Sequence, residues 1–289
     1  MRLSLGERVY KAVNAAVFGM ITIVMLYPFI YVLAVSVSDV LSVSQGRVWL
    51  FPLGINFAAY KRIFSQGILW VSYRNSLIVL FLGTVLSVFL SIMAAYPLSK
   101  KRLRGRGFFT FLIALTMWIK VPMIPLYLNI QNLHLDNSLW GYIIAFSVSA
   151  FYVIILKTYF QSIHESLEES AKLDGASDFQ ILWNIMAPLA IPSILTIALY
   201  YAVDKWNGYF WAMLLLKDER LTLLQVYLKK LVVELNVSEE MNAMGDRGSI
   251  IPETFIYATI VVSVIPMILI YPFIQKYLIK GMMVGAVKG

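Results

Sequence analysis

Long apolar segments constrain this chain more than any other feature of its sequence. A helix that crosses the roughly 30 Å hydrocarbon core of a bilayer needs about 20 mainly apolar residues. Asp, Glu, Lys and Arg are absent from residues 12–38, 75–99, 137–156, 179–203 and 254–275, and residues 107–133 contain only Lys120. We therefore predict an all-α integral membrane protein with six transmembrane helices in a single domain, residues 1–289. The predicted spans are about 12–38, 75–99, 107–133, 137–156, 188–212 and 254–275.

The composition is that of a chain that dissolves mainly in lipid. Hydrophobic residues make up 60% of the chain, charged residues make up 14%, and the mean hydropathy is +0.76. This apolar share exceeds that of an ordinary soluble domain. The net charge of +8 would suit nucleic acid, but the basic residues lie mainly in short segments beside apolar spans, so we expect no nucleic-acid partner. With no cysteine and two histidines, we expect no disulfide, metal site or cofactor in this chain.

Basic residues predict how the chain is oriented. The link between the second and third spans carries five cations and no acid: Lys100, Lys101, Arg102, Arg104 and Arg106. Cytoplasmic loops are enriched in Lys and Arg, so we expect this link to be cytoplasmic. Six crossings then place both termini in the cytoplasm as well. The first span is longer than the apolar core of a secretory signal, about 7–15 residues, so we expect it to be retained.

The loop between the fourth and fifth spans, residues 161–188, contains two signals for the start of a helix. Ser162 with Glu165, and Ser177 with Gln180, have the spacing of a capping box, in which each side chain bonds the backbone of the other residue. The loop therefore predicts two short helices on the cytoplasmic side.

A turn between the two helices is predicted at Asp174-Gly175, where glycine can take the positive φ that ends a helix. On the first helix Ile163, Leu167 and Ala171 recur at four-residue steps, which predicts one apolar stripe. The opposite, charged face carries Glu165, Glu168, Glu169 and Lys172. Such a helix is suited to dock in a groove of a partner.

The same loop contains a spaced set of residues, Glu169, Ser170, Ala171, Asp174, Gly175, Ile185 and Pro188. Their spacing resembles the EAA loop of ABC importer permeases. Two small departures are Ser170, where alanine is usual, and Ala187, where leucine is usual. The resemblance implies that the loop is a coupling helix seated in a cleft of the cytoplasmic ATPase. An amphipathic helix that only lies at the membrane interface is the alternative.

Other stretches extend the resemblance over almost the whole chain and narrow it to the carbohydrate-type, maltose-type permeases. They are Arg74-Asn75-Ser76-Leu77, Met123-Ile124-Pro125-Leu126, Asn137-Ser138-Leu139-Trp140-Gly141 and the tail of residues 275–289. In that family a glycine-rich tail reaches between the ATPase subunits, which implies ATPase contacts for Gly281, Gly285 and Gly289. A frayed terminus is the alternative.

The resemblance implies a multi-pass subunit of a binding-protein-dependent importer in the bacterial inner membrane. Its implied partners are a second permease subunit, an ABC ATPase dimer, an extracytoplasmic solute-binding protein, a carbohydrate and the lipid bilayer. The chain has no GxxxxGK[ST] phosphate-binding motif. We therefore expect a transport subunit that is not an enzyme, with Mg-ATP bound by the separate ATPase.

Lys120 is the first candidate for the substrate path. A charge at membrane depth costs about 2.5–3.5 kcal/mol on insertion scales, so it should face a cavity or a partner. Lys120 precedes Pro122 and Pro125, which are expected to bend the span. A cationic lining would attract an anionic solute such as a uronate saccharide. An ion pair within the helix bundle, or a side chain that snorkels to the interface, is the alternative.

A second candidate for the path is the aromatic and amide segment near the outer half of the fifth span, with Trp206, Asn207 and Tyr209. Aromatic rings and amides suit a saccharide, which offers C–H faces and hydroxyls. The equivalent stretch of the family contributes to the pathway, usually with an acid where this chain has Gly208. An interfacial aromatic belt is the alternative.

The expected function is ATP-driven import of a carbohydrate, with an oligosaccharide favoured and an acidic one considered. A permease for another solute, such as a polyol or glycerol phosphate, remains open. An ion-coupled secondary transporter would usually show buried acids, and these spans contain no central Asp or Glu. A membrane-embedded enzyme would need carboxylates or histidines clustered at one depth, and the sequence shows no such cluster.

Overall fold

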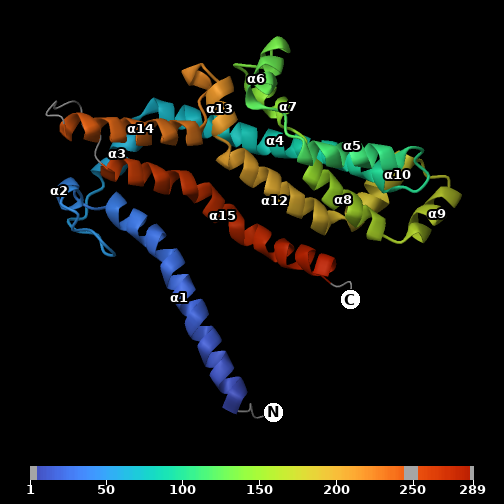
Figure 1. The fold of residues 1–289 in the computed structure, drawn as a ribbon, viewed down its shortest axis with the longest axis horizontal. Coiled ribbons are helices and arrows are strands. Elements are labelled where there is room, and N and C mark those ends of the chain that lie inside the picture. The colour runs from blue at the N-terminus through green and yellow to red at the C-terminus, as the bar shows by residue number, and fades with distance from the viewer. Residues whose placement is uncertain (1–4, 244–252, 287–289) are drawn as a thin grey trace. The chain divides into compact units, whose positions relative to one another are not determined.

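The computed structural model describes residues 5–243 and 253–286, whose regular structure consists of helices without a strand (Figure 1). In chain order the α-helices are α1 (Leu5–Ser36), α2 (Val40–Ser44), α3 (Ala58–Ser65), α4 (Gly67–Ser99), α5 (Arg106–Trp118), α6 (Met123–Asn132), α7 (Leu139–Ala145), α8 (Ala150–Ser162), α9 (Glu165–Leu173), α10 (Asp178–Ile181), α11 (Ala187–Leu189), α12 (Ile191–Asn207), α13 (Phe210–Leu215), α14 (Leu224–Ala243) and α15 (Glu253–Ala286). A π-helix, η1 (Leu182–Met186), joins α10 to α11, and a short 3-10 helix, η2 (Glu219–Leu221), precedes α14.

The chain divides into two compact units. One combines Met1–Leu69 with Leu228–Pro266, and the other combines Trp70–Tyr227 with Met267–Gly289. In the first unit, the end of α1 packs against α2, and the ring of Tyr31 meets that of Tyr257 edge to face, with 5.8 Å between their centroids. The second unit contains the loop that the sequence singles out.

Two helices are continuous, long and apolar enough to cross a bilayer, Val9–Ser36 within α1 and the whole of α4. They correspond to the predicted first and second spans, although α4 begins at Gly67 instead of residue 75. The helix pairs α5 with α6, α7 with α8, and α10–α11 with α12 are apolar but bent by 116°, 55° and 82°. The described residues therefore contain two clear spans, or up to five if each bent pair counts as one.

Two of the three bends lie at prolines. Pro122 immediately precedes α6, and Pro192 lies in the first turn of α12. Proline has no N–H and interrupts the hydrogen bonding of a helix interior, so each bend follows from the sequence. The predicted third span, residues 107–133, is thus two helices, and Lys120 lies in the link between them. The predicted fifth span, 188–212, begins within α11 and continues beyond the end of α12.

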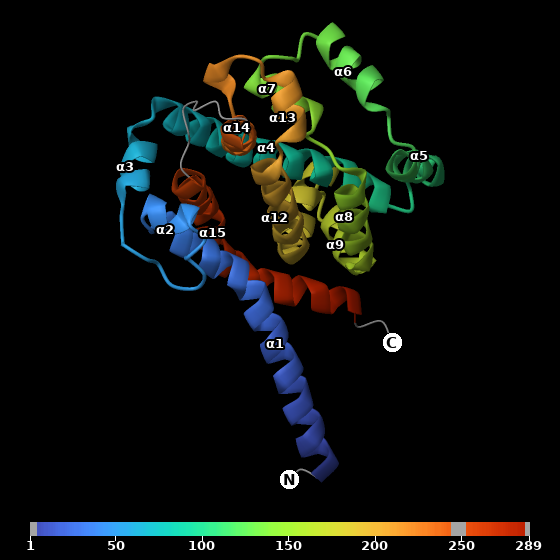
Figure 2. The same ribbon diagram turned by 60° about the vertical axis from the view of Figure 1, so that its left-hand side comes forward.

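The bend between α7 and α8 has no proline and depends on contacts from α12. The Phe146 carbonyl accepts a hydrogen bond of 2.5 Å from Lys205, and the Ser149 N–H donates one of 2.9 Å to the Tyr201 hydroxyl. Helix ends leave backbone groups without partners, and within a membrane these must be satisfied by protein. The side chains of α12 therefore replace helical hydrogen bonds that are missing between α7 and α8. Helices α8 and α12 lie side by side in both views (Figures 1 and 2).

Three polar positions in the sequence stretches that carry the resemblance hold the segment 217–224. Asn75 donates to the carbonyls of residues 220 and 222, and Ser76 accepts from the N–H of residue 224. Asn137, at φ +48°, accepts from the N–H groups of residues 217 and 218. Gly141 lies so close to the backbone that precedes α7 that a Cβ there would be 1.9 Å from the Leu135 oxygen. These polar contacts hold a segment whose Leu223 is buried in the core that α4, α7 and α13 share.

Candidate functional site

The predicted helix, turn and helix are all present in the loop after α8. Helix α9 ends at Leu173, and Gly175 takes φ +81°. The Gly175 N–H donates to the Lys172 carbonyl and the Ala176 N–H to the Ala171 carbonyl, both at 3.0 Å. This pair of bonds is the Schellman motif, which needs a left-handed residue and therefore favours glycine. The turn places α10 directly after α9.

One of the two predicted helix-start signals is correct. Ser177 and Gln180 form a complete capping box at the start of α10. Ser162 does not start a helix. It is the last residue of α8, and its hydroxyl donates at 2.7 Å to the Tyr159 carbonyl one turn back. Helix α9 begins after His164, which makes no side-chain cap bond.

The predicted apolar stripe on the first helix is wrong. Ile163 follows α8 and packs against its core, and Leu167 is exposed. The buried residues of α9 are Glu168 and Ala171, while Leu173 is 90% exposed. Ala171 belongs to the core that joins α4, α8 and α10. A glutamate therefore takes a place on the buried face of α9.

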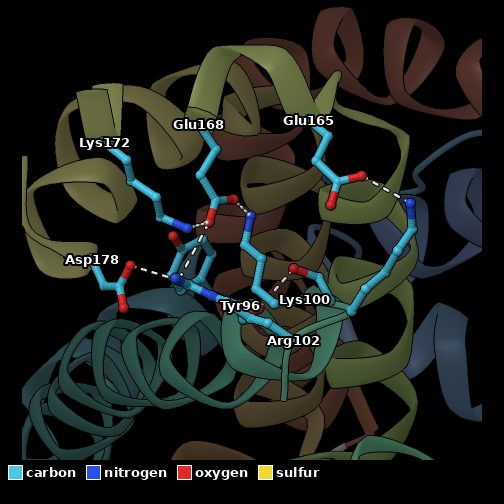
Figure 3. Close-up of polar contacts among 9 residues, drawn as sticks. Tyr96, Lys100, Arg102, Glu165, Glu168, Lys172 and Asp178 are labelled. Carbon is cyan, nitrogen blue, oxygen red and sulfur yellow. Dashed lines mark hydrogen bonds and ion pairs between the residues drawn. The ribbon is translucent and has the colours of Figure 1, made fainter. Parts of the chain in front are cut away.

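Glu168 can be buried because cations from two segments surround it (Figure 3). Its carboxylate accepts hydrogen bonds from Lys100 and, at 2.8 Å, from Lys172, and Arg102 lies 3.3 Å away. The Lys100 ammonium also lies 4.5 Å from the centre of the Tyr96 ring, a cation–π contact. A buried charge requires such pairing, and the arrangement joins α9 to the end of α4.

Two further ion pairs connect the same segments, and Figure 3 shows them on either side of Glu168. Arg102 contacts Asp178, the first residue of α10, at 2.5 Å, and Lys101 contacts Glu165 at 2.8 Å. Residues 100–105, which we call the basic loop, lie between α4 and α5. The basic loop therefore contacts both helices that flank the Gly175 turn.

Hydrogen bonding keeps these carboxylates ionised at neutral pH. Burial alone would raise the pKa of Glu168, but hydrogen bonds from Lys100 and Lys172 outweigh it and lower the pKa below the ordinary 4.5. The hydrogen bond from Arg102 likewise lowers the pKa of Asp178 from 3.8. Glu168 and Asp178 are therefore ionised near pH 7 and can pair with these cations.

The motif residues separate into an exposed and an anchored group. Glu169, Ser170, Asp174 and Gly175 are exposed, and nothing lies within 4 Å of where a Gly175 Cβ would be. Among the described residues Glu169 has no hydrogen-bond or ion-pair partner. Ala171 is buried, Ile185 packs against the same core from η1, and Pro188 lies in α11. The spacing thus combines residues that fix α9 with residues free to meet another protein.

The other candidate residues lie away from this loop. Lys120 is exposed in the α5–α6 link. Trp206 is buried and meets Tyr73 edge to face at 6.0 Å, whereas Asn207 and Tyr209 are exposed. Their place on a substrate path stays a prediction. Of the tail residues, Gly281 and Gly285 lie within α15, and Gly289 lies outside the described residues.

Sequence reasoning missed the roles of Glu168 and Lys205. Glu168 was assigned to the charged face, and Lys205, which directly precedes the aromatic and amide segment, was given no role. Lys205 is only 6% exposed, and its aliphatic chain packs beside Gly83. The missed signal is the same in both cases, because a charged residue within an apolar pattern needs a partner from elsewhere in the chain.

Within residues 5–243 and 253–286, the helical structure with apolar spans and an exposed loop anchored by charge has the features of a membrane transport subunit. Residues 87–284 match the family described as binding-protein-dependent transport system inner membrane component, and the chain belongs to this family. The predicted class, a permease subunit of an ABC importer and not an enzyme, is thereby confirmed.

Relatives resemble the chain over nearly its full length. The polygalacturonan/rhamnogalacturonan transport system permease protein YtcP of Bacillus subtilis is 43% identical, over 93% of this chain and 95% of its own length. Protein LplC of the same organism is 34% identical, over 98% and 96%. One chain in the crystal structure of a bacterial ABC transporter involved in the import of the acidic polysaccharide alginate is 45% identical. Its TM-score is 0.88, over 96% of this chain and 99% of that chain.

Proposed function

We propose that this chain is one permease subunit of an ATP-driven importer of an acidic oligosaccharide. The family description supports dependence on a binding protein. A relative named for polygalacturonan and rhamnogalacturonan transport and a structural neighbour from an alginate importer support an acidic carbohydrate as the substrate. The proposal includes a second permease subunit and an ABC ATPase dimer that holds Mg-ATP.

The observation that carries this proposal is the construction of the α9 loop. Its exposed side offers the unpaired Glu169 and an open Gly175 turn, and its other side is tied to the basic loop by Glu168. When the ATPase closes on ATP, it moves α9. The ion pairs then carry this displacement to the ends of α4 and α5, which is a rigid-body change of packed helices.

The proposed topology has six spans within one integral domain, with both termini and the basic loop in the cytoplasm. Each bent helix pair supplies one span, and α15 supplies the sixth. Because the chain has no cysteine, a Leu173→Cys variant would carry one thiol on the exposed end of α9. We expect a membrane-impermeant maleimide to label it in inside-out vesicles and not in right-side-out vesicles. The reverse pattern would refute the orientation.

On the proposed substrate path, Lys120 attracts a uronate carboxylate at the α5–α6 bend. The exposed Asn207 and Tyr209 bond sugar hydroxyls, and the buried Trp206 holds this segment in place. The tail residues Gly281, Gly285 and Gly289 contact the ATPase in this proposal.

A substitution series at Gly175 tests the coupling role. Inside this chain a Cβ at Gly175 meets nothing, so the cost of Gly175→Ala is backbone strain alone, about 1–2 kcal/mol. Gly175→Asn is the control, because asparagine tolerates a positive φ. We expect Gly175→Val to abolish transport and sugar-stimulated ATP hydrolysis while the subunit still inserts in the membrane. Normal transport by Gly175→Val would refute the coupling role.

A further inference from the structure

A groove beside the α9 loop has no role in the proposal above. Its volume is about 450 Å³, and it lies between the last turns of α4, the basic loop and the start of α10. Its apolar wall includes Met93, Pro97, Leu103 and Phe179, and its charged wall includes Lys100, Arg102 and Arg104. An apolar groove with a basic rim at the end of a membrane-spanning helix suits an amphiphilic anion.

The apolar wall continues along α4. Phe81, Val85, Phe89, Met93 and Pro97 are exposed at four-residue steps, which places them along one ridge that winds slowly around this helix. Apolar side chains exposed along a membrane-spanning helix suit contact with lipid chains, since lipid is as apolar as they are. The stripe ends at the groove.

Aromatic rings join this stripe to α10. Phe89 stacks on Trp183 with centroids 6.0 Å apart and an interplanar angle of 10°, and Trp183 meets Phe179 edge to face at 6.1 Å. Phe179 is 62% exposed at the groove. Tryptophan is enriched at the boundary between the hydrocarbon core and the headgroups, so Trp183, in contact with Phe179, favours a position of the groove near that boundary.

The basic loop has more positive charge than its ion pairs use. Lys100, Lys101 and Arg102 contact three of the four acids of α9 and α10, namely Glu168, Glu165 and Asp178. Arg104 is exposed and has no acid partner among the described residues. The Arg102 guanidinium has five N–H donors, and its contacts with Glu168 and Asp178 are made by its Nη2 nitrogen. Both arginines line the groove. They can therefore bind a phosphate without breaking the contacts of α9.

We propose that the groove binds an anionic phospholipid of the cytoplasmic leaflet, with its phosphate at Arg104 and Arg102 and an acyl chain along Met93 and Phe89. This inference rests on the orientation in the proposed function, which places the basic loop in the cytoplasm. Anionic lipids of that leaflet attract basic segments next to membrane spans. Since Arg102 also contacts Asp178, the bound lipid holds the basic loop against α10 and stabilises the anchored position of α9.

The test measures lipid binding directly, without sugar or ATP, so it does not depend on transport. The delipidated complex in detergent is titrated with dioleoylphosphatidylglycerol or dioleoylphosphatidylcholine and analysed by native mass spectrometry. We expect the anionic lipid to bind more tightly, and Arg104→Gln to weaken it about fivefold. Lys101→Gln is the matched control, since Lys101 belongs to the basic loop but does not line the groove. Equal affinity for both lipids, or equal losses in both variants, would overturn the proposal.

A crosslinking experiment identifies the occupant in the membrane. A photoreactive amino acid at Met93, which is 38% exposed on the groove wall, reacts with whatever lies there. We expect crosslinks to phosphatidylglycerol in vesicles that contain the whole complex. Crosslinks to the second permease or the ATPase would show that a protein covers this surface and would contradict the lipid site.

Discussion

Replacement of Glu168 by glutamine tests how α9 is anchored. The change keeps the size of the side chain and removes the charge that Lys100, Arg102 and Lys172 share. These contacts differ in how far their side chains are exposed to solvent. The Glu168 and Lys100 side chains are 7% and 14% exposed, whereas Arg102 and Lys172 are 48% and 35% exposed. A hydrogen bond to a charged group withdrawn from water contributes about 1.5–3 kcal/mol, and partly exposed pairs add little.

We therefore expect Glu168→Gln to reduce the free energy that holds α9 against the basic loop by about 2 kcal/mol, which is about a 30-fold change in the docking equilibrium. Hydrogen exchange of the α9 amides measures this equilibrium, because local opening exposes them. The expected result is exchange about 30-fold faster in α9, with α4 unchanged.

Glu165→Gln is the matched control for this experiment. Glu165 lies on the same helix and pairs with Lys101, but both side chains are exposed, at 59% and 79%. We expect this variant to exchange like the wild type, since exposed ion pairs contribute little. If Glu168→Gln also exchanged like the wild type, the ion pairs would not anchor α9, and the reasoning would be refuted.

Two further predictions concern stability and pH. Gly141→Ala should prevent recovery of folded protein, because its Cβ would lie 1.9 Å from the Leu135 carbonyl oxygen, whereas Gly107→Ala, with open space around it, should fold normally. Size-exclusion chromatography in detergent checks both variants, and a normal profile for Gly141→Ala would contradict the close approach. The protection of the α9 amides from hydrogen exchange should not change between about pH 6 and pH 8 and should fall only in acid. The pKa values of Glu168 and Asp178 are lowered, so their stabilisation is present above the ordinary values of 4.5 and 3.8 and is lost as the pH falls through the lowered values. Hydrogen exchange corrected for its intrinsic pH dependence checks this, and a change near neutrality would contradict it.

Local signals in the sequence predicted local structure well. The turn at Gly175 and the capping box at Ser177 need only the residues within one helical turn, so their patterns were sufficient. Ser162 shows the limit of this approach. The same capping pattern occurs there, but α8 continues through Ser162, since Phe160 and Ile163 on either side pack against the core. Packing overrode the local preference.

The α7–α8 bend and the anchoring of α9 depend on residues far apart in the chain, whereas local prolines mark the other two bends. The α7–α8 bend is stabilised by Lys205, 59 residues after Phe146. Glu168 was assigned to a solvated face, and Lys100, 68 residues before it, makes burial possible. Hydropathy detects a segment long enough to cross the bilayer but contains no information about such a partner. The class of protein and the bend at Pro122 were therefore predictable, while the α7–α8 bend and the charge network required the structure.

The central claim, that this subunit takes part in ATP-driven import of an acidic oligosaccharide, is tested most directly by ATP hydrolysis in the reconstituted complex. The complex contains the co-purifying permease, ATPase and binding protein, and it is challenged with uronate and neutral oligosaccharides of equal length. We expect uronates to stimulate hydrolysis and Lys120→Met to reduce that stimulation. Stimulation by neutral sugars alone, or by none of the sugars, would contradict the account.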